Sequence, residues 1–584
     1  MTSLYHHLLW FVFLFITFIV SLLLSLYVRY LSERFYVSFN LFSFWNNDIS
    51  VSFYFDYISM WFRTIILIIR SVIIVYSYFY IAPYSKTVYF LWITNLFILS
   101  ILLVVNLSNL FFLILGWDGL GLVSFFLIVY YQNQSSITSG VFTLLINRLG
   151  DRFFLVTIML FFYYHSDLTS FSSNLPSFIV LFFLMITFIT KRALYPFSPW
   201  LPLAIAAPTP ISALVHSSTL VTSGLYLIIR FSYLLYRSYL LIKLLLILRL
   251  FTSFYAGINS IFEKDIKKII ALSTLRHLGF IGIAFSAGLL HLAFFHMLTH
   301  ALFKSLLFIT IGDIIINLNH SQDIRYLSSG ILYTPMSCFV MYVSILNLLG
   351  LPNLRGYFSK DLVLEIINYS SSSILIIFVL FLNVFFTYYY TYQLFFYSFQ
   401  PIKLLPYQNF HSPILLHTVL LSFMAVSTLL FGFFFISHIC SFLLFYPVPN
   451  VNKWLPLFIN ITIFLVLFLN KKLFTSNNPL VNYYFSNIMY LSNLILTASS
   501  NLYYNLGFII VKSVEIGLFS YSLNVYTKNS FFQLTQLVLK LAILNRIKIV
   551  LYTSLLLLFL NVLLLLNNIN YYIWLLLIKF HYWI

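Results

Sequence analysis

Long apolar stretches recur along almost the whole chain and are separated by short polar connections. A helix needs about 20 apolar residues to cross the hydrocarbon core of a membrane. Inside lipid the backbone must satisfy its own hydrogen bonds, and these stretches lack the alternation of a membrane barrel, so we predict helices. The predicted spans cover residues 8–28, 58–82, 88–107, 109–131, 140–163, 176–191, 211–235, 239–262, 268–290, 292–316, 331–350, 364–399, 414–446 and 455–470.

Proline and glycine interrupt this pattern in two places. The first lies between Lys191 and Pro210, and the second between Leu349 and Asp361. Proline removes a backbone donor and kinks a helix, which a membrane tolerates only where protein or water satisfies the freed groups. Interrupted helices in both halves of a chain are typical of transporters built from internal repeats, although an ordinary kink explains either one alone.

The C-terminal region has a different pattern. Residues 481–549 mix Asn, Ser, Tyr and Lys with apolar positions and contain no proline. This pattern predicts an amphipathic helix along a partner surface, followed by a last span at 551–566. Several short helices joined by loops fit the composition equally well.

Composition excludes several classes of protein. The 584 residues are 62% hydrophobic and only 8% charged, too few charges to cover a soluble domain. The formal charge of +18 comes from sparse basic residues between spans, which favours membrane topology over nucleic-acid binding. Two cysteines cannot supply an iron–sulfur cluster, and the glycines of residues 116–121 lack the order of a dinucleotide site. We expect no nucleic acid, NAD, flavin or cluster on this chain. The first span lacks a cleavage site and is expected to be retained.

Ionisable residues inside apolar spans are costly and therefore candidates for function. Asp118 lies in Gly116-Trp-Asp-Gly-Leu-Gly121. A lysine is the type of residue that pairs with such a carboxylate, and Lys191 is the candidate. A carboxylate–lysine pair whose geometry changes can load and release a proton. The alternatives are a helix cap for Asp118 and a lysine reaching the membrane surface for Lys191.

A stripe of titratable side chains is the most informative pattern. His296, His300 and Lys304 are spaced by four, so a helix places them on one face with about 6 Å of rise between neighbours. Imidazole titrates near neutral pH, which makes a proton relay plausible. The pattern lacks the glutamate of the zinc-protease motif and continues with a cation, so we predict no metal. Buried, hydrogen-bonded histidines are the alternative.

Further charged positions accompany these spans. Lys360 and Asp361 stand beside the second interruption, and His216 follows the first. We predict an ion pair for Arg148 and a charge-coupling role for Asp151, while His216 fits a relay or a hydrogen-bonded core equally well. The polar run at residues 263–268 is expected to be a solvated loop and helix start.

These motifs together resemble the antiporter-like proton-pumping subunits of respiratory complex I (NADH:ubiquinone oxidoreductase), and among them the subunit 5 members. The resemblance covers about residues 50–365, and the stretches around His216 and His296 are the most specific. The matching stretches are 116–124, 147–151, 199–202, Ala207-Pro-Thr-Pro-Ile-Ser to Gly224, 265–274, Phe295-His-Met-Leu-Thr-His-Ala-Leu-Phe-Lys304 to Phe308, 322–325 and 356–361.

The resemblance implies an all-α polytopic membrane protein with about 15 or 16 transmembrane helices. It would contain two inverted five-helix repeats with broken helices, a long C-terminal lateral amphipathic helix and a terminal anchor helix. The implied boundaries are 1–107 for N-terminal helices, 108–235 and 236–400 for the repeats, 401–475 for additional helices, 476–549 for the lateral helix and 550–584 for the anchor.

The resemblance also implies roles. Asp118 would pair with Lys191, and Asp151 with Arg148 would form a second charged pair. The relay would run through His216, His296, His300 and Lys304 to Lys360, followed by Asp361. Asp118 replaces the family's usual glutamate and is one methylene shorter. Arg192 adds a cation beside Lys191, and Arg276-His277 replaces a neutral polar pair.

The implied function is proton translocation coupled to quinone reduction elsewhere in the complex. NAD, FMN, iron–sulfur clusters and ubiquinone would then be bound by other subunits, with no cofactor on this chain. The implied partners are membrane lipids and other membrane-arm subunits, especially the adjacent antiporter-like subunit 4. The expected location is the mitochondrial inner membrane, or alternatively a bacterial plasma membrane. An Mrp-type cation/proton antiporter subunit, a sister subunit such as subunit 4, and a purely structural scaffold are the other interpretations.

Overall fold

The computed structural model describes most of the chain up to residue 439. The described ranges are 2–31, 34–44, 47–81, 87–164, 178–318, 320–328, 334–351, 354, 356–370, 374–399 and 415–439, with a few single positions between 456 and 489. The predicted lateral helix at 476–549 and anchor at 550–584 therefore lie outside the described residues, apart from isolated positions.

Helices dominate the described ranges, as predicted. In chain order the elements are α1 (Thr2–Leu31), β1 (Phe35–Phe44), β2 (Asn47–Phe55), α2 (Tyr57–Ile81), α3 (Thr87–Asn106), α4 (Leu110–Ile128), η1 (Val129–Tyr131), α5 (Gln134–Tyr164), α6 (Phe178–Lys191), α7 (Trp200–Leu203), η2 (Ala204–Ala206), α8 (Thr209–Leu214), η3 (Val215–Thr219), α9 (Leu220–Arg230), α10 (Ser232–Tyr236), α11 (Tyr239–Phe262), α12 (Ile266–Ser286), α13 (Leu290–Asn317), η4 (Ile324–Tyr326), α15 (Pro335–Leu349), η5 (Tyr357–Asp361), α16 (Leu362–Ser370), α17 (Ile374–Ser398) and α18 (Leu415–Ile439).

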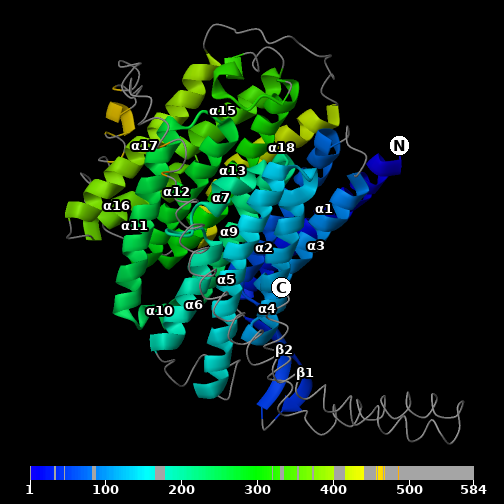
Figure 1. The fold of residues 1–584 in the computed structure, drawn as a ribbon, viewed down its shortest axis with the longest axis vertical. Coiled ribbons are helices and arrows are strands. Elements are labelled where there is room, and N and C mark those ends of the chain that lie inside the picture. Colours follow the sequence, from blue (N-terminus) through cyan, green and yellow to red (C-terminus); the bar gives the residue numbers. More distant parts are fainter. Residues whose placement is uncertain are drawn as a thin grey trace, which may run out of the picture. The chain divides into compact units, whose positions relative to one another are not determined.

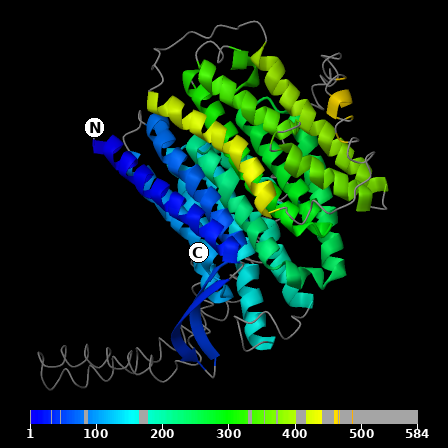
Figure 2. The same cartoon turned by 180° about the vertical axis from the view of Figure 1, so that it is seen from behind.

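Nine helical segments in the described part of the chain are long and apolar enough to cross a membrane. Segment Leu290–Asn317 (α13) is buried along its length, whereas α1 exposes most of its apolar side chains. Figure 1 shows α13 among the other helices, and Figure 2 shows α1 and α18 on one face, where the Phe15 and Phe423 rings lie 5.9 Å apart. An all-α, multi-pass membrane fold is confirmed.

Both predicted interruptions are present. Helix α6 ends at Lys191, and the chain continues through turns to α7 and η2 before α8. Helix α15 ends at Leu349, where Gly350 adopts the left-handed conformation (φ 81°) that favours glycine at a helix end. The chain resumes as the π-helical turn η5. A second π-helical turn, η3, joins α8 to α9, and such turns are frequent at functional sites.

One element was not predicted, a β-hairpin between α1 and α2. Strands β1 and β2 pair antiparallel from Phe35–Phe55 to Phe44–Asn47, with an irregularity between Asn40 and Phe42. The hairpin extends from one end of the helices (Figure 1) and is tied to the start of α4. There the Asn109 side chain donates to the Ser50 carbonyl (2.9 Å) while its oxygen caps α4 at the Phe111 amide (3.0 Å).

The predicted single span at 364–399 is wrong. The chain forms α16, ending at Ser370, and α17, beginning at Ile374. Serine occupies positions 370–373 in the sequence, and serine is a residue type that disfavours helix interiors. The repeat boundaries at 108–235 and 236–400 stay predictions.

Candidate functional site

Lys191, the last residue of α6, is surrounded by protein. Its ammonium group donates to the Trp117 backbone carbonyl of α4 and lies 3.8 Å from the centroid of the Trp117 ring. The Asp151 carboxylate of α5 is 3.5 Å from the Lys191 Nζ. The end of α6 therefore places a buried cation against α4 and α5 at the first interruption.

Asp151 also links Lys191 to a second ion pair. Arg148 Nη1 lies 3.8 Å from Asp151 and 3.4 Å from Asp118. Two acids and two bases thus alternate in a line, Asp118, Arg148, Asp151, Lys191, whose formal charges cancel. Buried charges persist in proteins when they are paired in this way. We call these four residues the acid–base line.

The predicted pairing needs a correction here. Asp118 pairs with Arg148, whereas the carboxylate within ion-pair distance of Lys191 is Asp151. Arg148 and Asp151 are three residues apart on one face of α5, so that helix inserts both charges between α4 and α6. The ion pair predicted for Arg148 is confirmed.

The acid–base line runs from the interior to the surface of the chain. The exposed fraction of the side chain rises from 0% at Lys191 through 6% at Asp151 and 26% at Arg148 to 38% at Asp118. Asp118 lies midway along α4. A charge exposed at that depth requires a polar or protein neighbour, because lipid offers none.

Arg192 turns away from the acid–base line. Its guanidinium donates to the Leu278 carbonyl of α12, and the neighbouring Arg249 donates to the Gly282 carbonyl one turn further on. The guanidinium of Arg192 is therefore accommodated by α12, whereas the contacts of Lys191 come from α4 and α5.

A second buried cluster lies between α12 and α13. Lys304 donates to the Ser273 hydroxyl (2.5 Å), and the ring of His277 lies 5.6 Å from that of His300 and 5.8 Å from that of His296. The predicted stripe on α13 is thus one face of a buried titratable cluster. His277 and Ser273 of α12 were not predicted to belong to it; their i, i+4 spacing was the available signal.

The cluster continues into the second interruption. His296 Nδ1 is hydrogen-bonded to Ser359 (2.9 Å), which precedes Lys360 in η5. The Lys360 ammonium donates to the Thr387 hydroxyl of α17 (3.2 Å). Asp361 is buried, with Gly350 packed against its carboxylate. Interruption and stripe therefore meet at Ser359.

His216 lies in η3 and is fully buried. Its ring centroid is 6.3 Å from that of Trp200, whose indole donates to the Thr190 carbonyl, next to Lys191. Trp200 thus connects His216 to Thr190, the residue before Lys191. Among the described contacts, no hydrogen bond or ion pair continues from His216 to Lys304, so the structure shows two clusters.

The polar run at residues 263–268 is only partly solvated. Lys268 pairs with Asp265 at 2.9 Å, and both are exposed enough to contact solvent. Glu263 and Lys267 are buried instead, so their prediction as solvated residues is wrong. Backbone hydrogen bonds explain this burial. The Ile266 amide donates to the Gln322 carbonyl and the Ile324 amide donates to the Lys264 carbonyl, and these bonds hold the segment against the connection after α13.

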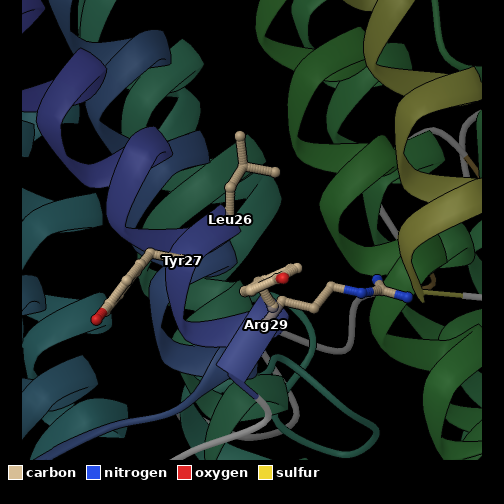
Figure 3. A pocket seen from close by; sticks show the side chains of 4 residues that line it. Leu26, Tyr27 and Arg29 are labelled. Carbon is tan, nitrogen blue, oxygen red and sulfur yellow. The ribbon is translucent and has the colours of Figure 1, made fainter.

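No group of three or more His, Cys, Asp or Glu residues in the described ranges is arranged to hold a metal ion. A pocket of about 460 Å³ lies at the end of α1, lined by Leu26, Tyr27, Arg29 and Tyr30. Figure 3 shows Tyr27 and Arg29 pointing to opposite sides of that helix. Tyrosine and arginine at a helix end are typical of a membrane–water interface, and none of these residues belongs to either cluster.

Comparison with known proteins gives consistent matches. Residues 108–387 match the family model described as NADH:quinone oxidoreductase/Mrp antiporter. NADH-ubiquinone oxidoreductase chain 5 of Anopheles gambiae is 37% identical over 492 residues, covering 81% of this chain and 83% of that protein. The Locusta migratoria chain 5 is 41% identical over 399 residues, covering 66% and 68%.

Two solved structures share the fold. A chain of the Mrp complex from Dietzia sp. superposes with a TM-score of 0.65 at 22% identity, covering 82% of this chain and 56% of that chain. A chain of the membrane-bound sulfane sulfur reductase, an archaeal respiratory membrane complex, gives a TM-score of 0.62 at 18% identity, covering 73% and 90%.

Proposed function

The chain belongs to the NADH-ubiquinone oxidoreductase chain 5 family, and from that premise we propose how its buried charges move protons. It is a proton-translocating membrane subunit of that oxidoreductase. We propose that the redox reaction proceeds on other subunits, which bind NAD, FMN, iron–sulfur clusters and ubiquinone, and that this chain contributes only the proton path.

The observation that carries the proposal is the acid–base line ending at the fully buried Lys191. A change of charge near Asp118 alters the pairing of Arg148, which then holds Asp151 more or less closely. Because Asp151 is the carboxylate nearest Lys191, that shift changes how well the buried ammonium is stabilised. The line thus converts an electrostatic signal at its exposed end into proton uptake or release at Lys191.

The second cluster supplies the onward carriers. A proton released from Lys191 passes by His216 toward Lys304, then through the imidazoles to Ser359 and Lys360. Each of these groups is buried, so protons move between positioned side chains and intervening water and do not exchange freely with solvent. Asp361, next to Lys360, offers the carboxylate that favours the proton at the exit.

We propose that a neighbouring antiporter-like subunit, of the subunit 4 type, covers Asp118 and Arg148. Supporting this is their exposure midway along α4 and α5, where lipid cannot solvate charge. We place the complex in the mitochondrial inner membrane, since the chain 5 relatives named above are animal respiratory proteins.

Replacement of Lys304 tests the function. Lys304→Met keeps an unbranched side chain only one atom shorter and removes the titratable ammonium group, so proton pumping coupled to NADH oxidation should fall roughly tenfold or more. The exposed Lys264→Met is the matched control and should pump normally. The measurement is acidification by vesicles containing the assembled complex. Full coupled pumping in Lys304→Met would refute the relay.

A cation/proton antiporter of the Mrp type is the second candidate, favoured by the fold shared with a chain of the Mrp complex. Its distinguishing property would be a sodium flux that needs no NADH. Vesicles containing the complex and loaded with ²²Na⁺ distinguish the two: retention of the label under an imposed pH gradient supports the oxidoreductase assignment, and exchange supports the antiporter.

A further inference from the structure

We propose that His277 of α12 is a third imidazole of the proton path and provides a route from Lys304 to His296 that bypasses His300. This inference rests on the proposed function and assigns the path through its second cluster. The sequence stripe on α13 supplies only one set of carriers, whereas the structure brings a second set from α12 against it.

Two stripes face each other across the α12–α13 contact. Ser273 and His277 are one turn apart on α12, and Lys304, His300 and His296 follow one another by single turns on α13. The chain reverses direction between Ser286 and Leu290, so the helices run antiparallel. Ser273 accordingly meets Lys304, while His277 meets both histidines.

The rings are held in place by aromatic packing. Phe303 contacts the rings of His277 (6.0 Å) and His300 (5.5 Å), and Phe280 stands edge-on to His296 at 5.5 Å. All three histidines are buried. Ring centroids 5.6 to 5.8 Å apart leave room for one nitrogen to exchange a proton with the next, directly or through one water.

Four ring nitrogens of this cluster are free to take part in the exchange. His277 Nε2, both nitrogens of His300 and His296 Nε2 are buried with no protein hydrogen-bond partner among the described residues. A neutral imidazole accepts a proton at one nitrogen and releases one from the other, which returns it to the neutral state. Buried, unpartnered ring nitrogens aimed into one cluster fit proton carriers better than structural side chains.

The step balances as a pure proton transfer. The Lys304 ammonium gives a proton through the Ser273 hydroxyl or a water to His277, and His277 gives its other proton to His296. His296 Nδ1 passes a proton to the Ser359 hydroxyl, which relays one to Lys360. No bond to carbon changes, and the net result is one proton moved from Lys304 to Lys360. Each imidazole ends neutral but in its other tautomer, and each hydroxyl ends with its proton turned round, so the carriers return to their starting state by reorientation before the next proton.

Parallel routes predict a specific pattern of mutant effects. His300→Gln and His277→Gln keep a polar side chain but cannot carry a proton as imidazole does, and each alone should lower pumping by about threefold or less. The double variant should lower it by well over tenfold, because carriers in contact are coupled and the two routes then close together. His291→Gln, at the exposed start of α13, is the matched control.

The readout is protons pumped per NADH in vesicles containing the whole complex, with assembly checked by native electrophoresis. An assembled double variant whose loss equals the product of the single losses would overturn the parallel route. Loss of all pumping in His300→Gln alone would also overturn it. This second test needs no substitution at position 277, so it holds even if His277→Gln impairs folding. Normal pumping in Lys304→Met would instead overturn the proposed function.

Discussion

The buried lysines Lys191 and Lys304 are each held by a contact from a neighbouring helix, Lys191 by the Trp117 carbonyl of α4 and Lys304 by the Ser273 hydroxyl of α12. His296, His300 and Lys304 share a face because four residues make about one turn, and the structure keeps them together. The choice of Asp151 over Asp118 as the contact of Lys191 depends on how α4, α5 and α6 pack. The sequence likewise shows His277 as a departure from the family pattern. It does not show that His277 contacts the histidines of α13, because those partners lie on another helix.

The order of charges in the acid–base line makes a prediction about Asp151. Asp151→Asn leaves the fully buried Lys191 without its contact carboxylate, and removing one partner of a buried ion pair costs about 3–5 kcal/mol. Asp118→Asn removes a charge at the exposed end of the line, which Arg148 and Asp151 separate from Lys191. We expect Asp151→Asn to impair pumping and assembly more than Asp118→Asn, measured side by side in vesicles and on native gels. The reverse order would show that Lys191 responds directly to Asp118.

Glu263, in the connection between α11 and α12, makes a prediction about pH. Burial raises the pKa of its carboxyl to about 7, from 4.5 in an unfolded chain. The folded chain therefore favours the protonated acid, and this group costs stability as pH rises from about 4.5 to about 7. Glu263→Gln should stabilise the chain in the complex at pH 8 by on the order of 2 kcal/mol and by much less at pH 5. Thermal release of the subunit from purified complex measures this, and an equal gain at both pH values would contradict it.

Helices and their interruptions could be predicted from apolar length and proline. Other element-scale features could not. The hairpin of β1 and β2 was missed although residues 37–41 alternate apolar and polar positions, because the surrounding apolar excess favours membrane helices. The split between α16 and α17 was missed because a short run of serines hardly lowers the mean hydropathy of a long apolar stretch.

Helix packing at Gly150 makes a prediction at this scale. A Cβ there would lie 2.1 Å from Thr190 Oγ1, so only glycine lets α5 approach α6 closely enough to bring Asp151 to Lys191. Gly150→Ala should push the helices apart and reduce coupled pumping, and adding Thr190→Ala should restore part of it by removing the clashing hydroxyl.

The control for that variant is Gly121→Ala on α4. Its Cβ would meet ordinary van der Waals contacts, 3.8 Å to Asp151 and 3.9 Å to Asn147, so pumping should be retained. If Gly150→Ala pumps as well as the wild type, the distance between Asp151 and Lys191 does not limit the function.

At the scale of the whole molecule, buried charge is divided between two interrupted helices. Lys191 ends α6 and Lys360 lies in η5 after the break that follows α15, so each interruption carries one lysine. Only the acid–base line reaches the surface of the described chain by a series of ion pairs. This asymmetry supports the proposal that a neighbouring subunit acts on the proton path from the side of α4 and α5.

That side yields a prediction for the assembled complex. Leu115 precedes Asp118 by three residues on one face of α4 and is 62% exposed in the isolated chain, whereas Leu113 is 2% exposed. If a neighbouring subunit covers Asp118, then Leu115→Cys, in a background with Cys338 and Cys440 replaced by alanine, should resist a membrane-permeant maleimide in intact complex. The same cysteine should react once detergent separates the membrane subunits. Leu113→Cys should stay unreactive in both states because this chain itself buries it. Because only the thiolate reacts with maleimide, rapid labelling of Leu115→Cys in intact complex would show that water reaches this face of α4 and that no subunit covers Asp118.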